Sequence, residues 1–145
     1  MSDFHRFGAA VVQAAPVLFD RDATLDRVAE LTAAAAAEGA RVILFPEAFV
    51  PAYPRGLSFG AVVGSRSPEG RDLWARYWEQ SVDVPGPACE RLAAIARQHS
   101  VELVIGIIER RGTAAGGTLY CTTLYFGASG ELRGLHRKLK PTGAE

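Results

Sequence analysis

The sequence predicts a single α/β domain in which a mixed β-sheet is flanked by helices. Short apolar runs alternate with amphipathic stretches along the chain, and such an alternation near the N-terminus is typical of a β-α-β unit with parallel strands. Further along, two strand-like segments, residues 118–126 and 131–136, flank a short Gly-containing loop and indicate a hairpin. The sheet is therefore expected to be mixed, and no interior linker divides residues 1–145.

The β-α-β unit is expected in the first third of the chain. Residues 7–15 (FGAAVVQAA) form a short apolar run and predict a buried strand. Asp20 or Asp22 can cap the following helix, whose apolar positions recur at helical spacing over residues 25–36 and which Gly39 ends. Residues 41–45 (RVILF) predict the second strand, and the crossover between the two strands is expected to be right-handed.

The middle of the chain is expected to contain a loop, two helices and a central strand. Residues 51–70 carry Gly, Pro and Ser at loop frequencies, and residues 71–80 predict a short helix that bears both tryptophans. Pro87 is suited to the first position of another helix. Residues 101–108 (VELVIGII) are apolar at nearly every position, which predicts a strand covered on both faces.

Composition excludes several classes of function. Sixteen basic residues balance sixteen acidic residues, so no net charge favours nucleic acid or an anionic membrane. No apolar stretch approaches the length of a membrane helix, and no signal segment is visible, so a cytoplasmic protein is expected. The cysteines, Cys89 and Cys121, form no CxxC, and the three histidines show no metal-ligand spacing. We expect neither a metal nor a cofactor.

Two charged residues follow predicted strands directly. Glu47 comes just after residues 41–45, and Lys138 follows the last predicted strand. Ligands of open α/β sheets collect at the carboxyl ends of strands, and a carboxylate and an ammonium at adjacent strand ends could transfer protons and stabilise charge. Taken alone, Glu47 is better explained as a solvated loop residue, and Lys138 as part of a basic edge that limits strand pairing.

The sequence segments around both residues resemble those of a known family. Residues 45–54 (FPEAFVPAYP) resemble the first signature of nitrilases, and residues 136–142 (HRKLKPT) followed by Glu145 resemble the second. The opening run AAVVQAAP resembles the first strand of the same family. The resemblance implies that Glu47 is the general base, that Lys138 stabilises the tetrahedral intermediate, and that Glu145 orients substrate or moves protons. The Pro-Thr and Pro-Ala-Tyr-Pro segments are similar to the corresponding segments of true nitrilases. This similarity implies hydrolysis of a nitrile by water to a carboxylic acid and ammonia.

The resemblance also implies what must complete the enzyme. The family's nucleophilic cysteine lies in a Cys-Trp-Glu motif downstream of the second signature, and this sequence ends before that motif. Relatives form a four-layer α-β-β-α sandwich, of which this chain resembles the N-terminal half. We therefore expect an uncovered apolar sheet face, a complementing C-terminal polypeptide that carries the cysteine, and a homo-oligomeric assembly.

Two alternatives remain open. The chain could be a non-catalytic relative with the same fold that acts as a binding or assembly partner. It could also be a small stand-alone hydrolase that uses Cys89, because a thiol in the first turn of a helix can have a lowered pKa. Cys121 lies within a predicted strand, where relatives usually carry Asn, and is expected to be buried and inert.

Overall fold

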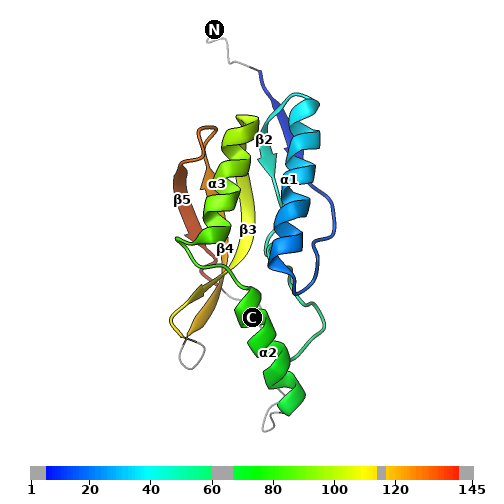
Figure 1. The fold of residues 1–145 in the computed structure, drawn as a ribbon, viewed down its shortest axis with the longest axis vertical. Helices are drawn as coiled ribbons and strands as arrows, with labels where there is room; N and C mark the ends of the chain where they lie inside the picture. Colours follow the sequence, from blue (N-terminus) through cyan, green and yellow to red (C-terminus); the bar gives the residue numbers. More distant parts are fainter. Residues whose placement is uncertain (1–5, 60–66, 114–116, 141–145) are drawn as a thin grey trace.

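The computed structural model describes residues 6–59, 67–113 and 117–140, and it confirms the predicted order of elements. Five strands and three helices follow one another along the chain (Figure 1): β1 Gly8–Val11, α1 Arg21–Ala37, β2 Ala40–Leu44, α2 Pro68–Gln80, α3 Pro87–His99, β3 Glu102–Arg111, β4 Thr118–Phe126 and β5 Leu132–Arg137. Within these residues no helix is long and apolar enough to cross a bilayer.

The strands form one mixed sheet in the order β1-β2-β3-β4-β5. β1, β2 and β3 pair in parallel, whereas β4 is antiparallel to both β3 and β5. The prediction of a mixed α/β sheet is therefore confirmed. Because two antiparallel steps restore the direction, β5 runs parallel to β2 and β3, and the carboxyl ends of these three strands lie at the same edge.

Three element boundaries differ from the predictions by three residues or more, for identifiable reasons. β1 ends at Val11 and not at residue 15, because β2, its partner strand, ends at Leu44. α2 begins earlier than predicted, at Pro68, because the Ser67 hydroxyl caps the helix by accepting the Gly70 N–H at 3.1 Å. β3 continues beyond the apolar run to Arg111, because β4 pairs with it from Leu103 to Arg111.

One face of the sheet is covered by α1 and α3, which lie side by side across it (Figure 1). We call it the closed face. Side chains from the three central strands point into this layer and are fully buried with Val28 of α1 and Leu92 of α3: Ile43, Leu103, Ile105, Ile107 and Leu124. Aspartate capping supports α1, since the Asp20 carboxylate accepts the Ala23 N–H at 2.9 Å.

The opposite face, which we call the open face, carries apolar side chains that are exposed. Val11, Leu44 and Tyr125 lie on it and are 76%, 41% and 40% exposed. Alternation along each strand places them opposite the buried set. Near the carboxyl edge this face is covered, because Ile108 packs there against Ala48 and Tyr77. The expected uncovered apolar face is therefore present over the rest of the sheet.

Candidate active site

Glu47 and Lys138 meet at the carboxyl edge of the sheet. The Lys138 Nζ lies 3.1 Å from the Glu47 Oε1, and the two side chains are 31% and 61% exposed respectively. The sequence placed them at adjacent strand ends, and that detail is wrong, because β3 and β4 separate β2 from β5. They come together on the open face, where the chain after β2 continues beside β3 and bulges over Gly106. Glu145 lies outside the described residues.

The segment that bears Glu47 is fastened to β3 on both sides. Before it, the Phe45 N–H donates to the Val104 carbonyl at 2.8 Å and the Pro46 carbonyl accepts the Gly106 N–H at 3.2 Å. After it, Val50 donates to the Gly106 carbonyl and accepts from the Ile108 N–H, at 3.3 and 2.8 Å. Glu47 therefore sits on a short bulge between two anchor points, which restricts where its carboxylate can lie.

Gly106 permits the close approach of this bulge to β3. A Cβ atom on Gly106 would lie 2.3 Å from the Pro46 carbonyl oxygen and 2.5 Å from the Glu47 Cα. Both contacts are with backbone, so neither can be relieved by moving a side chain. The sequence suggested only a buried strand here, and the single glycine in an otherwise branched apolar run was the signal that a close backbone approach was needed.

Lys138 follows directly after β5 and continues its pairing. Its N–H donates to the Cys121 carbonyl at 2.8 Å. The preceding residue, Arg137, donates from Nη2 and Nε to the two carboxylate oxygens of Glu109, at 2.6 and 2.7 Å. The Thr122 hydroxyl donates to the same carboxylate at 2.8 Å. Glu109, which the sequence analysis missed, is fully buried, and a charged residue directly after an apolar run was its only signal.

Glu109 is held in the ionised form despite its burial. Burial raises the pKa of its carboxyl group, but hydrogen bonds from Arg137 and Thr122 and the charge of Arg137 outweigh that effect and leave the pKa below its usual value. The same contact raises the pKa of Arg137. The guanidinium also lies 4.9 Å from the centre of the Tyr120 ring.

Two cavities adjoin Lys138. The larger, about 450 Å³, is mostly apolar, with Tyr53, Phe59, Trp74 and Tyr77 among its walls. The smaller, about 330 Å³, is lined by Glu47, Thr123 and His136 among others, and Lys138 lines both. Apolar walls beside a few convergent polar groups are typical of small-molecule sites.

Cys121 also lines both cavities and is only half-buried. The prediction that Cys121 is buried and inert is therefore wrong on burial. The error arose because the apolar strand pattern did not show that its side chain points to the open face. The two cavities there are bordered by Glu47 and by α2.

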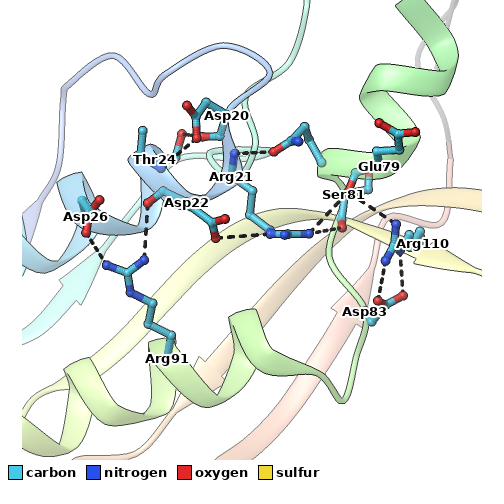
Figure 2. Close-up of polar contacts among 12 residues, drawn as sticks. Asp20, Arg21, Asp22, Thr24, Asp26, Glu79, Ser81, Asp83, Arg91 and Arg110 are labelled. Atoms are coloured by element: carbon cyan, nitrogen blue, oxygen red, sulfur yellow. Dashed lines mark hydrogen bonds and ion pairs between the residues drawn. The ribbon is translucent and has the colours of Figure 1, made fainter.

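A polar network fixes α2, and with it the aromatic wall (Figure 2). Arg21 and Arg110 donate to carbonyls in the last turn of α2 or just beyond it, at 3.2 to 3.5 Å. Arg110 also forms a bidentate pair with Asp83, at 2.7 and 2.8 Å. Cations at the carboxyl end of a helix satisfy its free carbonyls. The end of α2 is thus tied to the start of α1 and to β3.

Cys89 does not belong to this site. It lies in the first turn of α3 on the closed face, is 6% exposed, and donates to the Asp83 carbonyl at 3.4 Å. Burial, with Glu109 as the main nearby charge, raises the pKa of the thiol to about 11. The reading of Cys89 as an activated nucleophile is therefore wrong, because burial outweighs the helix dipole. Among the described residues, no cluster of His, Cys, Asp or Glu could hold a metal ion.

Comparison with known proteins identifies the family. The sequence profile of the carbon-nitrogen hydrolases matches residues 8–145, so the chain belongs to the carbon-nitrogen hydrolase family. It is 49% identical over 137 residues to a bifunctional nitrilase/nitrile hydratase of Lupinus angustifolius, covering 94% of this chain and 38% of that protein. It is 51% identical over 140 residues to an aliphatic nitrilase of Sinorhizobium fredii, covering 97% of this chain and 44% of that protein.

Solved structures show the same fold. An amidase from Nesterenkonia sp. superposes with a TM-score of 0.62 at 23% identity, covering 93% of this chain and 43% of that one. A carbon-nitrogen hydrolase from Helicobacter pylori superposes with a TM-score of 0.61 at 19% identity, covering 92% of this chain and 40% of that one. This chain therefore spans less than half the length of the relatives that it matches.

Proposed function

We propose that this chain supplies the general base Glu47 and the charge-stabilising Lys138 to a nitrilase whose nucleophilic cysteine is not among residues 1–145. The 3.1 Å contact between Lys138 Nζ and Glu47 Oε1 is the observation that carries this proposal. It places a proton acceptor and a fixed positive charge at one point beside two cavities. Nitrilases among the similar proteins support a nitrile as the substrate.

The proposed reaction consumes one nitrile and two waters. Glu47 accepts the thiol proton, and the thiolate attacks the nitrile carbon to form a thioimidate. Lys138 offsets the negative charge that develops first on nitrogen and later on oxygen. Water attacks the thioimidate and ammonia leaves; a second water then releases the carboxylic acid and restores the thiol. Glu145 is proposed to orient substrate or move protons.

The larger cavity is proposed to hold the organic group of the substrate. Its aromatic side chains contact one another, with Phe59 stacked on Tyr77 at 5.4 Å and edge-on to Trp74 at 5.6 Å. Such mutual packing makes a firm apolar wall. Because Lys138 lies at its rim, an apolar group held there would present its nitrile to the Glu47–Lys138 pair. Cytoplasmic location and a homo-oligomeric state stay predictions from the sequence.

The test is ammonia release from nitriles by the complemented enzyme, meaning this chain combined with the C-terminal part of a nitrilase that carries the cysteine. Glu47→Gln should lower kcat by roughly 100-fold or more, because it removes the base. Glu30→Gln, an exposed carboxylate of α1, is the matched control and should leave kcat unchanged. Hydrolysis of amides but of no nitrile would reject the nitrile assignment. Partner capture without turnover, unaffected by Glu47→Gln or Lys138→Ala, would instead favour the non-catalytic binding role.

A further inference from the structure

The proposed chemistry leaves the ion pair Glu109–Arg137 without a role. Glu109 has none of its surface exposed, yet it stays ionised and is bound by Arg137, whose side chain is 32% exposed, through two hydrogen bonds. Burying a carboxylate in such a pair adds little stability compared with an apolar residue of the same volume, while breaking the pair is costly. We therefore ask which part of the chain this ion pair positions.

What it holds in place is the end of β5. Successive residues of a strand point to opposite faces, so Arg137 and Lys138 point apart. Arg137 reaches Glu109 on the closed-face side of β3, and Thr122, its register partner in β4, binds the same carboxylate. Lys138 then points to the open face, where its Nζ contacts Glu47.

The end of β5 lies at an edge of the sheet. Among the described strands, β5 pairs with β4 alone. A backbone hydrogen bond from the Lys138 N–H to the Cys121 carbonyl continues that pairing at Lys138. A lysine side chain has four rotatable bonds and no planar group to fix its direction. A fixed neighbour is therefore an effective way to set its starting direction.

We propose that Glu109 and Arg137 are positioning residues, whose bidentate pair fixes the rotation of the β5 end so that the Lys138 ammonium faces Glu47. The inference rests on the proposed function, because it assigns these residues to the action of Lys138. Glu109 itself lies on the other face of the sheet and touches no reacting atom.

The decisive experiment compares Glu109→Gln with wild type in the complemented enzyme. Gln keeps the side-chain volume and one acceptor oxygen but loses the charge and the second Arg137 contact. We expect kcat to fall roughly 10- to 100-fold because Lys138 is misplaced. KM should stay within about twofold, because the cavity walls are not altered. Arg137→Lys, which keeps the charge but not the two-point contact, should give an intermediate kcat.

The matched control is Asp26→Asn. It removes the charge from another arginine–carboxylate pair, between Asp26 of α1 and Arg91 of α3, which is drawn in Figure 2. That pair lines neither of the cavities beside Lys138, so kcat should stay within about twofold of wild type. Thermal unfolding of each variant separates a loss of positioning from a loss of folded enzyme.

Two results would overturn the inference. One is a Glu109→Gln enzyme with wild-type kcat, and the other is an equal loss of kcat in Asp26→Asn. If Glu109→Gln fails to fold, Arg137→Lys decides: a wild-type kcat rejects the positioning role, and a reduced kcat with unchanged KM supports it. If the enzyme converts amides and no nitriles, the nitrile proposal fails, and the same kcat comparison on an amide still decides the role of Glu109.

Discussion

The two faces of the sheet differ in how far their apolar side chains are buried. On the closed face, α1 and α3 bury the side chains of β2, β3 and β4, and the pair Glu109–Arg137 is satisfied within this chain. On the open face, Val11, Leu44 and Tyr125 are exposed, and the Glu47–Lys138 pair stands beside two cavities. The closed face thus holds most of the buried core, whereas the open face leaves apolar side chains exposed beside the candidate site.

The largest effect is expected from a substitution in the core of the closed face. Ile105 is fully buried among the side chains of α1, α3 and the central strands. Ile105→Ala should lower the free energy of unfolding by about 2–5 kcal/mol, because it leaves a cavity in a packed core. Urea unfolding of the complemented enzyme measures the loss. Arg27→Ala, at an exposed position of α1, is the control, and an equal effect of both changes would contradict a single closed core.

The second change tests the close approach of the Glu47 bulge to Gly106 of β3. Gly106→Ala should lower kcat roughly 100-fold, because the added methyl group displaces the backbone at Pro46 and Glu47. Steady-state kinetics of the complemented enzyme measure the effect. Gly134→Ala on β5 is the matched control, since a Cβ there meets no atom within 4 Å. Wild-type activity in Gly106→Ala would show that the position of Glu47 does not depend on this close approach.

The third change tests what the open face contacts. Leu44→Asp should weaken binding of the complementing polypeptide by at least roughly 10-fold, because an unpaired charge would be buried at the interface. Titration of a labelled C-terminal polypeptide with this chain measures Kd. Arg41→Asp, at an exposed position of the same strand, is the control. An unchanged Kd for Leu44→Asp would mean that the partner does not cover this face.

The fourth measurement compares the two thiols, one on each face. At pH 8 iodoacetamide should modify Cys121 several-fold faster than Cys89, because Cys89 is buried and its pKa is about 11. The folded-state pKa of Cys89 is raised, so its contribution to stability is complete below about pH 9 and is lost as the pH rises toward 11. Mass spectrometry of peptides gives the two rates, and faster modification of Cys89 would contradict the assignment of faces.

Much of the fold could be predicted from local sequence patterns. The apolar runs, the Asp20 cap and the hairpin loop indicated the element order because each depends on residues close in the chain. The end of β1 could not be predicted, because it depends on where its partner strand β2 stops. The true end of β3 was missed for a related reason, since pairing with β4 carries the strand past its apolar residues.

The sequence by itself determined the α/β class and, through resemblance to nitrilase signatures, the candidates Glu47 and Lys138. Only the tertiary structure decided that these two residues touch, because they come from strands separated by two others. It also decided the roles of Gly106, Glu109 and the two cysteines. The physical reason is that close backbone approach, burial and ion pairing depend on residues distant in sequence, whose distances are set only when the sheet forms.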